Sequence, residues 1–155
     1  MKASAAAARA SRQVGLYDAD FFEWTRSTAM LLRQRRFKDL DVDHAAEEIA
    51  DMGKRECKEL GSRLQVLVAH LLKWRLQPRK RSNSWRATIV TERLEIERTL
   101  RDSPSLRRRL LADLDEHYRD GVKRAAAETG LRIGAFPERC PFSIDQILDE
   151  EFLSE

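Results

Sequence analysis

The stretch that decides the fold is residues 60–76, LGSRLQVLVAHLLKWRL. Large apolar side chains recur in it at alternating spacings of four and three residues, at Leu60, Leu64, Leu67, Leu71 and Trp74. This spacing predicts one apolar seam along an α-helix, and such a seam requires partner helices. The segment therefore predicts a helical protein whose core surrounds it.

The helix that contains this seam extends far toward the N-terminus. It is predicted to begin at Asp41 or Asp43 and to end near Leu76, because Pro78 cannot continue it. A helix of this length would measure about 50 Å. Part of it is therefore expected to project from the core or to form a homodimer.

Two glycines, Gly53 and Gly61, interrupt the predicted long helix. Each costs about 1 kcal/mol relative to alanine in a helix interior. The close approach of another helix would explain them, and so would a bend. The sequence leaves both explanations open.

Further helices are predicted on both sides of the long one. They cover about residues 18–35, 83–101 and 103–130, with a short last helix from residue 143. The third of these is expected to begin at an N-cap followed by proline, Ser103-Pro104, and to end at Gly130. The sequence Ser143-Ile144-Asp145-Gln146 is a capping box, which predicts the start of the last helix.

Short connections favour antiparallel packing of successive helices. The predicted fold is therefore all-α, an up-down antiparallel helical bundle built around one long helix, with a short C-terminal helix. We expect residues 16–155 to form a single helical domain. Residues 1–15 are expected to form a basic, alanine-rich N-terminal extension.

Composition narrows the function classes. The 155 residues are 42 % hydrophobic and 35 % charged with a net charge of +3, which is too small to indicate a nucleic-acid binder by itself. No apolar run is long enough to cross a membrane. The two cysteines, Cys57 and Cys140, lack the spacing of zinc or redox motifs, so a reduced cytoplasmic location is expected.

Charge is unevenly distributed along the chain. Between Lys73 and Arg86 there are six basic residues and no acid. The loop expected between the long helix and the next one lies in this run, and free backbone N–H groups are expected where the next helix begins. These features predict an anion-binding site for phosphate, sulfate or acidic groups, formed by Arg79, Lys80, Arg81, Ser82, Ser84 and Arg86. A purely structural explanation is also open, in which Ser82 or Ser84 is an ordinary N-cap and the basic residues offset the helix dipole.

A second group of polar residues lies early in the long helix. His44, Glu47, Glu48 and Asp51 are spaced three or four residues apart, so they fall close together on the helix surface. They are the alternative site, for a metal ion or for acid/base chemistry. The paired Glu-x-x-His motifs of di-iron bundles are absent from the sequence, so neither a metal nor another cofactor is expected.

Seven ordered blocks of sequence resemble one known family. They are LYDADFFEW (16–24), EEIADMG (47–53), HLLKW (70–74), QP (77–78), RSNSW (81–85), SPSL (103–106) and CPF (140–142). Together they resemble the bacterial domain-of-unknown-function family twenty-nine over about residues 16–153. The resemblance implies an all-helical bacterial domain with no assigned activity. Arg79 and Phe142 depart from the pattern, where an acid and a tyrosine are frequent, so the resemblance does not extend to the whole basic run.

The sequence contains no catalytic fingerprint, and it leaves open whether the protein is an enzyme. The first hypothesis is a non-enzymatic binding module that uses the basic loop to contact an anionic partner, either a protein or a nucleic acid. The alternative is an enzyme that uses the acidic residues and histidine of the long helix. A homodimer through the long helix is a further possibility.

Overall fold

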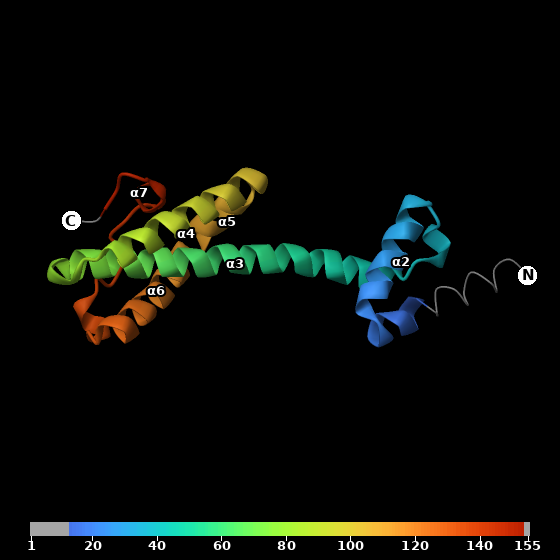
Figure 1. Cartoon of the computed structure of the whole chain (residues 1–155), viewed down its shortest axis with the longest axis horizontal. Coiled ribbons are helices and arrows are strands. Elements are labelled where there is room, and N and C mark those ends of the chain that lie inside the picture. Colours follow the sequence, from blue (N-terminus) through green and yellow to red (C-terminus); the bar gives the residue numbers. More distant parts are fainter. Residues whose placement is uncertain (1–12, 154–155) are drawn as a thin grey trace, which may run out of the picture. The chain divides into compact units, whose positions relative to one another are not determined.

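The computed structural model describes residues 13–153, and it is helical without strands over that range (Figure 1). Residues 13–19 are helical. The elements that follow are α2 (Phe21–Arg33), η1 (Phe37–Asp39), α3 (Val42–Leu76), η2 (Pro78–Lys80), α4 (Asn83–Asp102), α5 (Leu106–Ala112), α6 (Leu114–Thr129), η3 (Ile133–Ala135) and α7 (Ile144–Leu148). The predicted all-α fold around one long helix is confirmed.

The chain divides into two compact units, a first that ends at Arg55 and a second that begins at Glu56. The 35-residue helix α3 belongs to both units. Because α3 is continuous across the boundary, this division does not test the expected single domain over residues 16–155. Most of the expected N-terminal extension, residues 1–12, lies outside the described residues.

The first unit packs around Trp24 of α2, which is 2 % exposed. Asp20 caps α2 by accepting a hydrogen bond from the backbone N–H of Glu23 at 3.0 Å. The helix expected over about residues 18–35 begins later than predicted, because Asp20 and not Asp18 is its N-cap and residues 13–19 form a separate helical segment. It ends at Arg33, close to the predicted end. The rings of Tyr17 and Trp24 meet edge to face, with centroids 5.0 Å apart.

The second unit holds the main core, which surrounds the C-terminal part of α3. Leu64, Leu67 and Leu71 of the predicted seam are fully buried, and they belong to one cluster with Ile89 and Ile96 of α4. Residues of α5, α6, α7 and the segment between η3 and α7 complete that cluster. The seam in residues 60–76 therefore has the partner helices that its spacing predicts.

Close approach between helices explains one of the two glycines in α3. A Cβ atom built on Gly61 would lie 2.4 Å from Cε1 of His117 in α6, so only glycine lets the ring sit there. On the other side of the same contact, a Cβ on Gly121 of α6 would lie 3.0 Å from Cγ1 of Val68. Gly53 is different, because nothing among the described residues lies within 4 Å of its added Cβ.

The helix predicted over residues 103–130 is two helices, α5 and α6. They meet at Asp113, whose ψ of 8° lies outside the helical range. Ser103 is not the expected side-chain N-cap, because its hydroxyl donates to Oε1 of Glu56 at 2.9 Å. Gly130 ends α6 in the left-handed conformation with φ of 73°, as predicted. The predicted capping box at Ser143 is also present.

Candidate functional site

The candidate site is the basic loop, which we define as residues 77–86, between the end of α3 and the first turn of α4. Two of its six predicted residues have structural roles. Ser82 is the N-cap of α4 and its Oγ accepts from the backbone N–H of Trp85 at 3.2 Å. Arg81 donates from Nε to the backbone oxygen of Trp74 at 2.9 Å, which satisfies a carbonyl in the last turn of α3.

The guanidinium of Arg81 is held in place from two directions. Its Cζ lies 5.1 Å from the centroid of the Trp74 ring, a cation–π contact, while Nε is fixed on the Trp74 carbonyl. The two terminal nitrogens of Arg81 make no hydrogen bond with any described residue. Arg81 therefore presents oriented donors at the surface of the loop.

The remaining predicted residues, Arg79, Lys80, Ser84 and Arg86, are exposed. Among the described residues none of the three basic side chains has an acidic partner. The backbone N–H groups of Asn83 and Ser84 in the first turn of α4 also have no protein acceptor there. Four cations and two free N–H donors thus lie on one short connection, and such donors favour a bound anion.

A buried ionic cluster lies beside the loop, and the sequence did not single it out. Lys73 is 5 % exposed and its Nζ lies 2.5 Å from Oε2 of Glu128 in α6. The same Nζ lies 4.5 Å from the centroid of the Trp85 ring and 3.4 Å from Nε2 of His70. Lys73, the first cation of the basic run, is therefore buried and paired in this cluster and does not contribute to the exposed basic surface.

The pKa values of two groups in this cluster follow from burial and charge. Burial would raise the pKa of Glu128, but the hydrogen bond and charge of Lys73 outweigh it and hold that pKa below its ordinary value. Burial lowers the pKa of His70, and the charge of Lys73 adds to the effect. His70 Nδ1 lies 2.9 Å from the carbonyl of Val66, so a neutral ring donates there and offers Nε2 to Lys73.

One sequence signal could have located this cluster. Every residue from Leu67 to Lys73 is buried, which means that α3 is surrounded on all sides at this level. The run VLVAHLL in residues 66–72 is apolar around the whole helix except for His70, and such a helix is normally buried. A lysine at the end of such a run requires an acidic partner. Glu128 is 55 residues away, so the sequence could not name it.

A third basic group, Arg107 to Arg109, lies at the other end of α4. The 20 residues of α4, a helix about 30 Å long, lie between it and the basic loop in the chain. Arg107 is paired with Asp145 at 2.6 Å, while Arg108 and Arg109 have no acidic partner among the described residues. These arginines therefore do not extend the basic loop.

The alternative site, His44, Glu47, Glu48 and Asp51, lies in the first unit, where its members have separate roles. His44 Nδ1 lies 2.5 Å from Oδ2 of Asp41, and its ring stacks on Tyr17 with centroids 3.8 Å apart. Tyr17 donates its hydroxyl to Glu48 at 2.7 Å. These contacts hold the segment before α2 against the start of α3.

Two acids of that group also pair with basic side chains of α3, whereas Glu47 is exposed. Glu48 also pairs with Arg55 at 3.1 Å, and Asp51 pairs with Lys54 at 2.8 Å. Over residues 13–153, no group of three histidine, cysteine, aspartate or glutamate side chains is placed so that it could hold a metal ion. Within that range the metal alternative has no ligand set.

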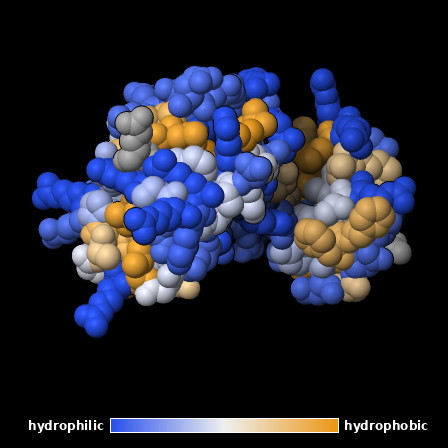
Figure 2. All heavy atoms as spheres, turned by 60° about the vertical axis from the view of Figure 1, so that its left-hand side comes forward, coloured by the Kyte–Doolittle hydropathy of each residue, from blue (hydrophilic) through white to orange (hydrophobic). Residues whose placement is uncertain are grey.

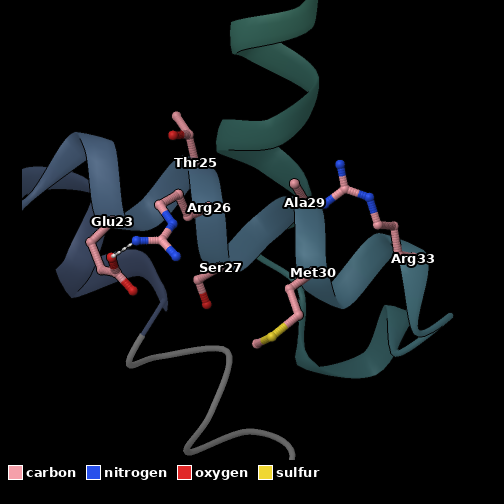
Figure 3. A pocket seen from close by; sticks show the side chains of 7 residues that line it. All are labelled: Glu23, Thr25, Arg26, Ser27, Ala29, Met30 and Arg33. Carbon is pink, nitrogen blue, oxygen red and sulfur yellow. Dashed lines mark ion pairs between the residues drawn. The ribbon is translucent and has the colours of Figure 1, made fainter.

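A cavity of about 460 Å³ lies along α2 in the first unit (Figure 3). Its described lining includes an ion pair between Arg26 and Glu23 at 3.9 Å, with Met30 and Arg33 farther along the helix. All seven lining residues belong to α2. The described lining of this cavity therefore comes from one helix, and its polar side chains do not converge on a common point.

Comparison with known families places the chain. It matches the family Domain of unknown function DUF29 over residues 16–153, which is nearly its whole length. The chain belongs to this family, as the seven blocks indicated. No curated protein and no solved structure shows a significant match. No helix in the described part of the chain is long and apolar enough to cross a membrane.

Proposed function

We propose that this protein is a binding module that holds an anionic partner on the basic loop, through phosphate or carboxylate groups. The observation that carries this proposal is the state of Arg81. Its guanidinium is fixed by the Trp74 ring and carbonyl, while its two terminal nitrogens have no protein acceptor among the described residues. A side chain held in this way loses little conformational entropy when it binds an anion.

The surroundings of Arg81 favour the same ligand chemistry. Arg79, Lys80 and Arg86 are exposed cations without acidic partners among the described residues. The start of α4 adds the partial positive charge of a helix N-terminus. Glu128, an acid of α6 beside the loop, is already paired with Lys73. An incoming phosphate or carboxylate therefore has no bound acid to displace.

Fluorescence anisotropy with two labelled probes tests the proposal, one a poly-glutamate peptide and the other a single-stranded oligonucleotide of random sequence. We expect the protein to bind at least one of them at low salt, with affinity that falls as salt rises. The variant Arg79→Ala/Lys80→Ala/Arg81→Ala is expected to bind at least about tenfold more weakly, since several charge-assisted hydrogen bonds are lost.

The matched control is Arg108→Ala/Arg109→Ala/Arg132→Ala, which removes the same charge from exposed arginines without acidic partners among the described residues. It should bind nearly as the natural chain does. Arg81→Lys keeps the charge but loses the planar fork, so it should lose most of what Arg81→Ala loses. Equal losses in the control and loop variants, or no binding of either probe at low salt, would refute the proposal.

A further inference from the structure

The first unit exposes an apolar helix face that none of its described residues covers. An α-helix turns by about 100° per residue. Over residues 42–53 of α3, this rotation places all the apolar positions within one arc of the helix surface about 160° wide. They are Val42, Ala45, Ala46, Ile49, Ala50, Met52 and Gly53. Val42, Ile49 and Met52 are 61 %, 66 % and 65 % exposed. Apolar side chains at the surface are visible in Figure 2.

The rest of the first unit packs on a neighbouring side of α3. Its contacts reach α3 through His44, which stacks on Tyr17, and through Glu48, which accepts the Tyr17 hydroxyl. The charged residues from Asp43 to Arg55 all lie outside the apolar arc. This segment is therefore an amphipathic helix whose apolar side lacks a partner within the unit.

Gly53 is a second and independent sign of a missing neighbour. A glycine in the middle of a helix is unfavourable, and at Gly61 the His117 ring explains it. At Gly53 an added Cβ meets nothing within 4 Å among the described residues. Gly53 lies on the apolar arc, beside Ala46 and Ala50. Small residues on one face allow the backbone of another helix to come close.

We propose that this face binds the same face of a second copy of the chain, with the two α3 helices antiparallel and a two-fold axis near Ala50. The charges that border the arc carry this choice. On one border Asp43 precedes Lys54, and on the other Glu48 precedes Arg55. An antiparallel copy places Asp43 opposite Lys54 and Glu48 opposite Arg55 of the second copy, whereas a parallel copy opposes like charges.

The two basic side chains are exposed enough to exchange their present partners for those of a second chain. Lys54 and Arg55 pair along their own helix with Asp51 and Glu48, yet their side chains are 75 % and 68 % exposed. Asp43 has no ion pair among the described residues. Near the axis, Ile49 of one copy packs against Met52 of the other. Three to four turns of paired helix bury less than a standard interface, so we expect a dimer with micromolar affinity.

Sedimentation velocity across the micromolar range tests the dimer. The natural chain should shift from monomer to dimer as its concentration rises. Ile49→Glu should remain monomeric. The matched control Leu94→Glu makes the same change at a similarly exposed apolar residue of α4 and should dimerise normally. A natural chain that is monomeric at high micromolar concentration, or a control that loses the dimer as Ile49→Glu does, would overturn the proposal.

The variant Gly53→Leu distinguishes a specifically packed interface from nonspecific association of apolar surfaces. The new side chain has open space within the described chain but would push a second helix away. A fitted antiparallel pair predicts that this more apolar variant loses the dimer. Stronger association of Gly53→Leu would instead show unspecific contact between apolar surfaces and would contradict the proposal.

Crosslinking determines the orientation. In a chain with Cys57 and Cys140 changed to serine, Ala50→Cys should crosslink rapidly to itself through a short bismaleimide. Val42→Cys should not, because antiparallel pairing places the two copies of that residue roughly 24 Å apart. Equal crosslinking at both positions would indicate parallel helices and refute the axis near Ala50. This proposal concerns the first unit and is independent of anion binding by the basic loop.

Discussion

Lys73 of α3 and Glu128 of α6 form an ion pair of 2.5 Å in which the lysine is almost fully buried and the carboxylate reaches the surface. This pair connects two helices at the end of the second unit that carries the basic loop. The ring of Trp85, in the first turn of α4, lies against the same ammonium group. Three helices therefore converge on one buried charge, and the loop between α3 and α4 is anchored there.

The asymmetry of this pair predicts unequal effects of removing its two members. Glu128→Ala leaves a buried ammonium without its counter-ion and should lower the free energy of unfolding by about 1–3 kcal/mol. Lys73→Met keeps the apolar stem and removes the charge, so it should change stability by less than about 1 kcal/mol. Urea unfolding followed by tryptophan fluorescence measures both.

The control for this prediction is Glu97→Ala, which breaks an exposed pair with Arg101 in the same unit. Its effect should stay below about 1 kcal/mol. If Lys73→Met proves as damaging as Glu128→Ala, the ammonium itself stabilises the fold through Trp85 or His70, and the predicted asymmetry is wrong.

Arg93 of α4 holds the C-terminal segment against the second unit through its guanidinium. Its guanidinium is buried and donates to the backbone oxygens of Ile147 at 2.8 Å, Glu150 at 3.3 Å and Phe152 at 2.6 Å. Arg93→Met should cost about 3 kcal/mol, because three charge-assisted bonds are lost and the carbonyl of the buried Ile147 is left without this donor. Hydrogen exchange should show faster opening of the segment after α7.

An exposed arginine on the same helix supplies the control. Arg98 is 65 % exposed and pairs with Glu95, so Arg98→Met should change stability by less than about 1 kcal/mol and leave exchange in the C-terminal segment unchanged. Unchanged exchange in Arg93→Met would mean that apolar packing of Ile147 and Phe152 alone holds the segment.

Much of this fold could be predicted because its signals are local. The seam from Leu60 to Trp74, the proline at residue 78 and the capping box at Ser143 each act within a few residues, and the structure has the helices that they predict. The break between α5 and α6 at Asp113 was not predicted. The hydrogen bond from the Ser103 hydroxyl to Glu56 was not predicted either. That hydrogen bond joins residues 47 positions apart, so no local pattern could reveal it.

The candidate site likewise has features that the sequence predicts and features that depend on contacts made in the fold. The basic loop was found because three of its four cations, Arg79, Lys80 and Arg81, are consecutive in the sequence. The orientation of the Arg81 guanidinium was not predicted, because it depends on the carbonyl and the ring of Trp74, seven residues earlier in the chain. The burial of Lys73 depends on Glu128 in a helix that is distant in sequence. Charge composition predicts where cations gather, while tertiary contacts decide which of them stay free.

Two histidines predict opposite responses to acid in the two units. The hydrogen bond from His44 to Asp41 raises the pKa of His44 above its ordinary value of about 6.5, whereas burial lowers the pKa of His70 below it. For His44 the folded state binds the proton more tightly than the unfolded chain does. Its contribution to the stability of the first unit is therefore complete below about pH 6.5 and is lost as pH rises through the folded pKa.

For His70 the sign is reversed, because the unfolded chain binds the proton more tightly. Acidification below about pH 6.5 should therefore destabilise the second unit until the pH reaches the folded pKa of His70. Proton NMR of the histidine Hε1 signals, assigned with His44→Gln and His70→Gln, should give a higher pKa for His44 than for His70. His70→Gln should also reduce the loss of stability in the second unit between pH 7 and pH 5. The reverse order of the two pKa values would show that neither the Asp41 contact nor the burial of His70 persists in solution.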